Sequence, residues 1–161
     1  MATKAKIGVL GASGYTGSEL VRMLLRHPRA QVVLLSAERN VGKAMREIFP
    51  QFSPFELPTL VGIEELDWAQ AALDVAFCAL PHATTQKVVQ ELLAKAPATK
   101  VVDLSADFRL HDPAAYANRF RLTPPQTAAL LGLDTPALVA MGVHPLVAFL
   151  ADMQVERQRK S

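Results

Sequence analysis

Residues 5–17 read AKIGVLGASGYTG, and this stretch decides the fold. Its first six residues form a short apolar run, which is typical of a strand buried on both faces. Glycines at positions 11, 14 and 17 then make a G-x-x-G-x-x-G turn. Apolar residues recur at helical spacing from Leu20 to Leu25, before His27-Pro28 ends the helix. Residues 31–36, QVVLLS, predict a second strand, so one βαβ unit is complete within about 30 residues.

A glycine turn between a strand and a helix is the arrangement that binds the pyrophosphate of a dinucleotide. Glycine lets a pyrophosphate approach the backbone closely because no Cβ obstructs it, and the helix N-terminus offers free N–H groups and a partial positive charge. The alternative is that the glycines only make a tight turn, but the flanking strands and helix favour dinucleotide binding. The candidate cofactor-binding residues of this turn are Gly11, Ser13, Gly14, Tyr15, Thr16 and Gly17.

Strands and helices continue to alternate to about residue 120. Residues 73–80 and 100–104 are apolar runs typical of buried strands, a helix fits residues 84–95, and residues 40–68 predict loops and short helices. This alternation predicts an α/β fold, a Rossmann-type parallel sheet with helices on both faces. We therefore expect a dinucleotide-binding domain over residues 1–120 and a short helical C-terminal tail over residues 121–161. The helices of the tail are expected over residues 124–131, 136–141 and 145–159.

The residues after the second strand should choose between NAD and NADP. NAD-binding domains usually place an acidic residue there for the ribose hydroxyls, whereas NADP-binding domains hold the 2′-phosphate with groups such as arginine. Glu38 is an NAD-like residue, while Ser36, Arg39 and Lys43 have side chains that suit a phosphate. Because Glu38 stands two residues beyond the expected strand end, we predict NADP with Ser36 and Arg39 as ligands. A solvated turn with an incidental Glu-Arg pair is the alternative.

The composition fits one ordinary globular domain. The chain has 161 residues with a formal net charge of +2, and 50% of them are hydrophobic. Wholesale disorder, a nucleic-acid binder and an anionic-membrane binder are therefore not expected. A single cysteine excludes a disulfide framework and a multi-cysteine zinc site, and no metal is predicted. Without an apolar run long enough for a membrane span or a signal peptide, we expect a cytoplasmic protein.

Three motifs together resemble the N-acetyl-γ-glutamyl-phosphate reductase family over about residues 4–120. They are the glycine turn, Leu80-Pro81-His82, and the run VVDLSADFRL at residues 101–110, which is the most specific of the three. The resemblance implies the NADP-binding half of an NADPH-dependent oxidoreductase of arginine biosynthesis, related to aspartate-semialdehyde dehydrogenase. The implied small-molecule substrate is an acyl phosphate, N-acetyl-γ-glutamyl phosphate, which the family reduces to the semialdehyde.

The same resemblance extends the candidate site to residues after the later strands. Pro81 and His82 follow a strand at its carboxyl end, where ligands bind in open α/β sheets, and would line the nicotinamide pocket. Ser105 and Arg109 are candidate substrate-binding residues, and Arg109 would hold the substrate phosphate. A structural salt bridge of Arg109 and a surface position for His82 are the alternatives.

The catalytic segments of the family are absent. Family members attack the acyl phosphate with a cysteine in an Asn-Pro-Gly-Cys segment and use a later histidine, and this chain has neither segment. Cys78 stands inside an apolar strand, where burial raises the pKa of a thiol, so we predict a structural role and name no catalytic residue. We expect a truncated chain that binds NADPH, is inactive alone, and lacks its catalytic half.

Other functions stay open at this point. One is a non-catalytic NADP-binding sensor or regulator with a helical interaction tail. A helix-turn-helix within residues 123–142 is disfavoured, because no Lys or Arg occurs between Arg121 and Arg157 to hold phosphates. We therefore expect no nucleic-acid partner and no membrane contact. The tail packs either on the sheet or on a second subunit of a homo-oligomer, and a foreign origin of the tail is a further alternative.

Overall fold

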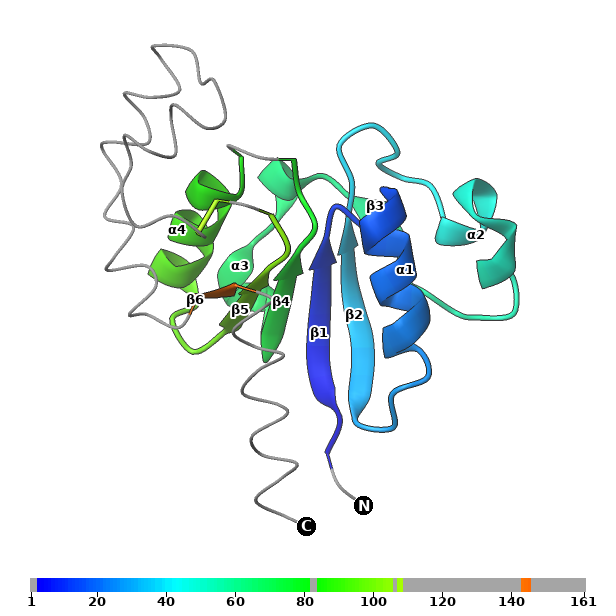
Figure 1. Cartoon of the computed structure of the whole chain (residues 1–161), viewed down its shortest axis with the longest axis horizontal. Coiled ribbons are helices and arrows are strands. Elements are labelled where there is room, and N and C mark those ends of the chain that lie inside the picture. The colour runs from blue at the N-terminus through cyan, green and yellow to red at the C-terminus, as the bar shows by residue number, and fades with distance from the viewer. Residues whose placement is uncertain (1–2, 82–83, 106, 109–142, 146–161) are drawn as a thin grey trace.

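The computed structural model describes residues 3–81, 84–105, 107–108 and 143–145 (Figure 1). Its strands are β1 (Ala5–Leu10), β2 (Ala30–Ser36), β3 (Leu60–Val61), β4 (Val75–Cys78), β5 (Lys100–Asp103) and β6 (Val143–Pro145). Its α-helices are α1 (Tyr15–Leu24), α2 (Met45–Ile48), α3 (Trp68–Ala71) and α4 (Thr85–Lys95). Two short 3-10 helices, η1 (Pro50–Phe52) and η2 (Ile63–Glu65), stand in the connections around β3.

All the strands belong to one parallel sheet with the order β3-β2-β1-β4-β5-β6. The first strand is central, and Val9 pairs with Leu35 of β2 on one side and with Phe77 of β4 on the other. The strand order therefore reverses between β1 and β4, as it does in Rossmann-type folds. The predicted fold class is confirmed. The reversal also brings the carboxyl ends of β1, β2 and β4 to one edge of the sheet.

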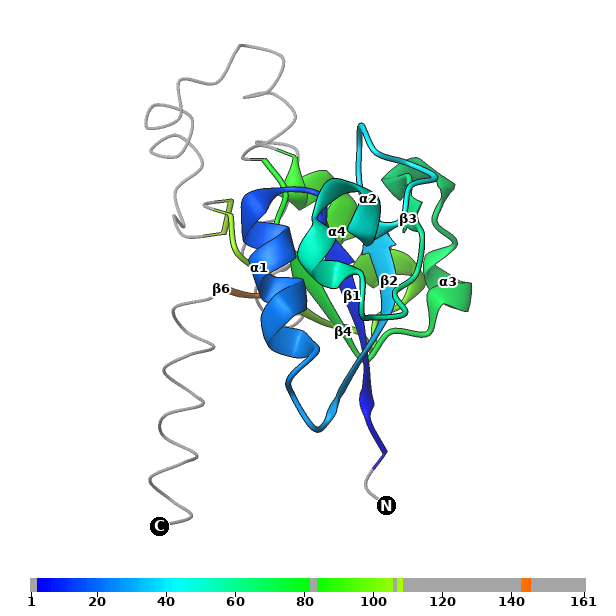
Figure 2. The same ribbon diagram turned by 90° about the vertical axis from the view of Figure 1, so that its right-hand side faces the viewer.

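Two apolar cores cover the two faces of this sheet. Val9 and Val102 belong to the first core with Leu20 and Val21 of α1, while their chain neighbours Leu10 and Val101 belong to the second core with residues of α3 and α4. Successive strand residues point to opposite faces, so continuous apolar runs are needed where both faces are covered. Figure 2 shows α1 and α3 on opposite sides of β1 and β2.

The predicted strands agree closely with the observed ones, and two short strands were not predicted. The expected strand over residues 73–80 is shorter, since β4 begins at Val75 and ends at Cys78. The connection over residues 40–68 contains β3 besides its short helices. At the other edge β6 pairs with β5, and Pro145, which we expected to begin a helix, ends this strand. The rest of the expected helical tail lies outside the described residues.

Candidate nucleotide-binding site

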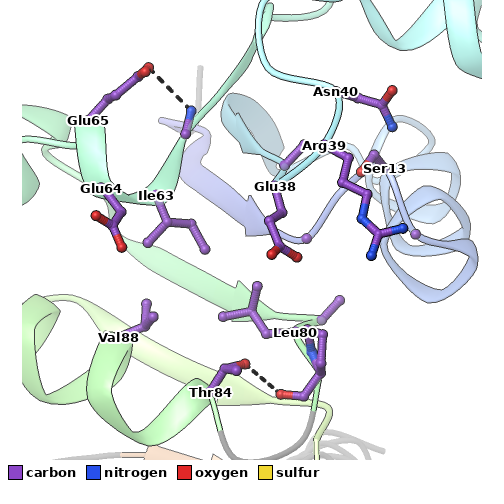
Figure 3. Close-up of a pocket in the computed structure, with 16 residues that line it drawn as sticks. Ser13, Glu38, Arg39, Asn40, Ile63, Glu64, Glu65, Leu80, Thr84 and Val88 are labelled. Atoms are coloured by element: carbon purple, nitrogen blue, oxygen red, sulfur yellow. Dashed lines mark hydrogen bonds between the residues drawn. The ribbon is translucent and has the colours of Figure 1, made fainter.

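A cavity of about 790 Å³ opens at the carboxyl edge of the sheet, beside the point where the strand order reverses (Figure 3). Ligands of open parallel sheets bind at this position because connections on the two sides diverge there. The wall comes from the segments after β1, β2, β3 and β4 and from the start of α4. The lining residues are Gly11, Ser13, Gly14, Ala37–Asn40, Gly62–Glu65, Ala79–Pro81, Thr84 and Val88.

Two glycines of the turn are required by the packing of the protein itself. Gly11 has a φ of +82°, and a Cβ there would lie 2.4 Å from the Ala79 carbonyl oxygen. A Cβ on Gly17 would lie 2.2 Å from the Gly11 carbonyl oxygen. Both contacts are backbone contacts that no side-chain movement relieves. These glycines let β1, the start of α1 and the segment after β4 approach one another.

The third glycine, Gly14, has no such requirement. Its backbone is extended, with φ −84° and ψ 165°, and a Cβ there would lie 3.5 Å from the Gly11 carbonyl oxygen, an ordinary contact. Gly14 is exposed and lines the cavity. The space that its missing side chain leaves open is therefore available to a ligand. A pyrophosphate that approaches the backbone needs this opening.

Gly14 is also the N-cap of α1, and no negative charge in the first turn offsets the positive end of the helix dipole. Among the residues that the structure describes, no side chain caps the helix, and its first turn contains no acidic residue. The partial positive charge of the helix N-terminus is thus not offset by a carboxylate in the first turn. Such an end favours a bound anion.

Ser36 ties the glycine turn to β2. Its hydroxyl oxygen accepts a hydrogen bond from the Gly11 N–H at 3.2 Å, and its carbonyl accepts one from the Ala12 N–H at 2.8 Å. Ser36 is fully buried and does not line the cavity. Arg39, three residues further on, is exposed and lines the cavity with Glu38 and Asn40. The end of β2 and the segment after it therefore contribute to the site in two ways. Ser36 holds the glycine turn from a buried position, and Arg39 forms part of the exposed cavity wall.

The structure brings half of the predicted cofactor ligands to the cavity. Gly11, Ser13, Gly14, Arg39 and Pro81 line it. The other predicted ligands that the structure describes do not line it. Tyr15 and Thr16 are exposed outside the cavity, and Gly17 and Ser36 are buried. His82 and Arg109 lie outside the described residues.

Sequence reasoning missed the wall that Gly62–Glu65 and α4 contribute. Gly62–Glu65 follows β3, a strand of two residues whose pattern is too short to predict. Thr84 and Val88 were assigned only to a helix, and the fold turns them toward the cavity (Figure 3). The one local signal was Gly62 directly after the apolar pair Leu60-Val61, a combination that also occurs in many loops.

Ser105 belongs to a buried hydrogen-bond network. Its N–H and hydroxyl donate to the two carboxylate oxygens of Asp103 at 2.9 and 2.8 Å, and its hydroxyl accepts from the Asp107 N–H at 3.0 Å. Asp107 in turn accepts from the Thr85 N–H at 3.1 Å and, through its carbonyl, from Gln86 Nε2 at 2.9 Å. The network joins the end of β5 to the first turn of α4. Ser105 does not line the cavity.

Cys78 is a core residue, as predicted. It is fully buried in the second apolar core. Burial raises the pKa of the Cys78 thiol far above its ordinary value, and the Asp103 and Asp107 carboxylates raise it further. A thiol in this state is a poor nucleophile. In the part of the chain that the structure describes, no helix is long and apolar enough to cross a membrane, and no cluster of His, Cys, Asp and Glu suits a metal ion.

The sheet order, the glycine turn and the cavity at the strand ends define a Rossmann-type dinucleotide-binding domain. A family model described as "Semialdehyde dehydrogenase, NAD binding domain" matches residues 6–144. The chain belongs to this family. The match runs beyond residue 120, where the resemblance of the motifs ended, and reaches the first two residues of β6.

Curated relatives carry the family name that the motifs indicated. The N-acetyl-gamma-glutamyl-phosphate reductase of Afipia carboxidovorans is 68% identical over 117 residues, which are 73% of this chain and 33% of that protein. The reductase of the same name from Rhodospirillum rubrum is 48% identical over 154 residues, 92% of this chain and 43% of the relative. The chain thus covers 33% of the length of the first relative and 43% of the length of the second.

Solved structures share the fold. An aspartate semialdehyde dehydrogenase with NADP from Candida albicans matches with a TM-score of 0.52 and 23% identity, covering 66% of this chain and 31% of that one. GenD2 from gentamicin A biosynthesis, in complex with NAD, matches with a TM-score of 0.55 and 16% identity, covering 90% of this chain and 34% of that one.

Proposed function

We propose that this chain binds NADP(H) in the cavity and provides the cofactor-binding part of an N-acetyl-γ-glutamyl-phosphate reductase. The reaction is the reduction of the acyl phosphate to the semialdehyde in arginine biosynthesis, in the cytoplasm. The observation that carries the proposal is Gly14, a glycine that the packing of the described residues does not require, at the uncapped N-terminus of α1 and in the cavity wall. When bound, NADPH supplies the hydride.

The pyrophosphate would lie against the glycine turn. Gly11 and Gly14 present backbone without side chains, and Ser13 adds a hydroxyl on the same wall. The N-terminus of α1 contributes the positive end of its dipole. Hydrogen bonds from the Gly11 N–H to the Ser36 hydroxyl oxygen and from the Gly14 N–H to the Gly11 carbonyl oxygen hold the backbone of this turn.

Arg39 is the residue that we propose for the 2′-phosphate. It follows β2 on the cavity wall, and Figure 3 shows its guanidinium on the side of the cavity that carries Ser13. A guanidinium holds a phosphate with two parallel hydrogen bonds. Ser36 is turned inward, and the Lys43 ammonium donates to the Asn40 side-chain oxygen at 3.3 Å and does not line the cavity. The preference for NADP therefore rests on Arg39.

The nicotinamide and the substrate complete the proposal. Pro81 lines the cavity directly after β4, and we place the nicotinamide ring near it together with His82. Arg109 is proposed to hold the phosphate of the substrate, as the resemblance implies. We further propose that residues 1–120 form the cofactor domain and that residues 121–161 add a helical tail, apart from β6, which pairs with β5 at the edge of the sheet. A catalytic half or a second copy of this chain is the proposed partner.

The experiment is a titration of the full chain with NADPH and NADH, followed by nucleotide fluorescence. Arg39→Ala should weaken NADPH binding by about 1.5–3 kcal/mol, or roughly 10- to 150-fold, and leave NADH binding nearly unchanged. Arg46→Ala is the control, since Arg46 is also exposed but does not line the cavity. Equal losses for both nucleotides in Arg39→Ala would refute the assignment of Arg39.

A further inference from the structure

The two ends of the cavity differ in chemistry. One end carries polar groups from the glycine turn and the segment after β2, represented by Ser13, Arg39 and Asn40. The other end is formed by η2 and α4, where Ile63 and Val88 face the cavity from opposite sides (Figure 3). A ligand with phosphates at one end and a flat apolar ring at the other fits this division.

The order of groups in a dinucleotide fixes which part reaches the apolar end. With the pyrophosphate at Gly14 and the ribose 2′-phosphate at Arg39, the base is the next group and must lie beyond them. Ile63 and Val88 then lie on the two sides of the base, and burial of aliphatic surface against a planar ring is favourable. This step rests on the proposed function, because it requires a dinucleotide in the cavity.

Two adjacent carboxylates, those of Glu64 and Glu65, also line the end of the cavity that contains Ile63, and of the two only Glu65 has a hydrogen-bond partner among the described residues. Glu65 accepts a hydrogen bond from the Gly62 N–H at 3.4 Å and so supports η2. Glu64 is exposed, and within the described part of the chain no hydrogen bond or ion pair engages its carboxylate. Figure 3 shows the Glu64 side chain next to Ile63, on the side of the cavity that faces Val88. A carboxylate is therefore available at the edge of the base.

We propose that Glu64 determines the base specificity of this site by favouring a purine with a 6-amino group over one with a 6-oxo group. An ionised carboxylate only accepts hydrogen bonds. It gains a charge-assisted bond from the 6-amino group of adenine, whereas hypoxanthine has an oxygen of like partial charge at that position and a donor only at the neighbouring ring nitrogen. A site that holds a group built for hydrogen bonding rejects an analogue that lacks the matching partner.

The test compares the affinity of the full chain for NADP⁺ and for its hypoxanthine analogue, deamino-NADP⁺, by calorimetric titration. The unmodified chain should favour NADP⁺ by about tenfold, the factor for one charge-assisted hydrogen bond at an exposed site. Glu64→Gln should reduce this ratio to about two or less, because a glutamine amide can turn to donate to the 6-oxo group. Glu56→Gln, an exposed glutamate outside the cavity, should keep the ratio of the unmodified chain.

The possible outcomes distinguish an error about Glu64 from an error about the cofactor site. An unchanged ratio in Glu64→Gln, or equal affinities in the unmodified chain, would overturn the role of Glu64 while the proposed cofactor site stands. A fall of the ratio in Glu56→Gln as large as in Glu64→Gln would also overturn it, since loss of negative charge alone would then suffice. If the unmodified chain binds neither nucleotide, both the proposed function and the role of Glu64 are wrong.

Discussion

The Ser36 hydroxyl oxygen accepts a hydrogen bond from the Gly11 backbone N–H, at 3.2 Å and across 25 residues of sequence. Ser36 is the last residue of β2 and Gly11 is the first residue after β1. The bond joins the carboxyl ends of two neighbouring strands at the point where the cavity begins. Ser36 is therefore a support for the glycine turn, although its place at the strand end also suited a phosphate ligand.

Replacement of Ser36 tests this support. Ser36→Ala leaves the Gly11 N–H without its partner and should lower the free energy of unfolding by about 1–3 kcal/mol. Urea denaturation measures this loss. Any loss of nucleotide affinity should be equal for NADPH and NADH, because the hydroxyl faces Gly11 and not the 2′-phosphate. A loss confined to NADPH would show that Ser36 contacts that phosphate after all.

The glycines of the turn should separate into two classes. Gly14→Ala should change stability by less than about 1 kcal/mol, because the restriction of the unfolded chain by alanine is offset by the loss of a glycine at the N-cap of α1. It should weaken nucleotide binding at least about tenfold, since the new Cβ enters the space of the pyrophosphate. Thermal unfolding and nucleotide titration of the same sample measure both effects.

Gly17→Ala provides the contrast within the same turn. Its Cβ would lie 2.2 Å from the Gly11 carbonyl oxygen, so we expect a loss of stability of about 1–3 kcal/mol from the forced backbone shift. If Gly14→Ala were destabilising by the same amount as Gly17→Ala, Gly14 would be a packing glycine and the main support for the cofactor site would be lost.

The buried thiol of Cys78 gives the protein a defined response to alkaline pH. An ordinary thiol has a pKa of 9.0, and burial raises the pKa of Cys78 in the folded chain. Above pH 9 the unfolded chain releases this proton while the folded chain keeps it, so stability should fall as the pH rises. The expected slope is up to about 1.4 kcal/mol per pH unit. Urea denaturation between pH 8 and about 10.5 measures it.

The control for this effect is Cys78→Ala, which lacks the titrating group. Both chains share the ionisation of lysine and tyrosine side chains at this pH, so only the difference between their slopes reports the thiol. The variant should show a shallower decline. Parallel declines would mean that Cys78 is ionised as readily in the folded chain as in the unfolded one.

Much of the fold could be predicted because the buried strands carry a strong local signal. The strands over residues 5–10 and 100–103 are apolar on both faces, and the glycine turn has a spacing that few other structures require. The edge strands could not be predicted in this way. Leu60-Val61 is too short for a pattern, and Val143–Pro145 acquires its strand conformation by pairing with β5, a contact distant in sequence.

The site was predictable where the spacing of residues along the sequence carries the signal. Gly11 and Gly14 follow from the turn, and Arg39 follows from its distance beyond β2. The direction of a side chain does not follow from the sequence, so Ser36 was expected in the cavity although it is buried. The wall that contains Ile63 and Glu64 depends on where β3 joins the sheet, and no local pattern contains that information.

The most direct test of the central claim is an NMR titration of the glycine-labelled chain with NADP⁺, because the claim concerns where the nucleotide binds. The amide signals of Gly11, Gly14 and Gly62, which line the cavity, should shift together and saturate with one binding constant. The signal of Gly8, which lies within β1 and away from the cavity wall, should move little. Absence of shifts at millimolar NADP⁺, or saturable shifts that leave Gly11 and Gly14 unmoved, would contradict the account.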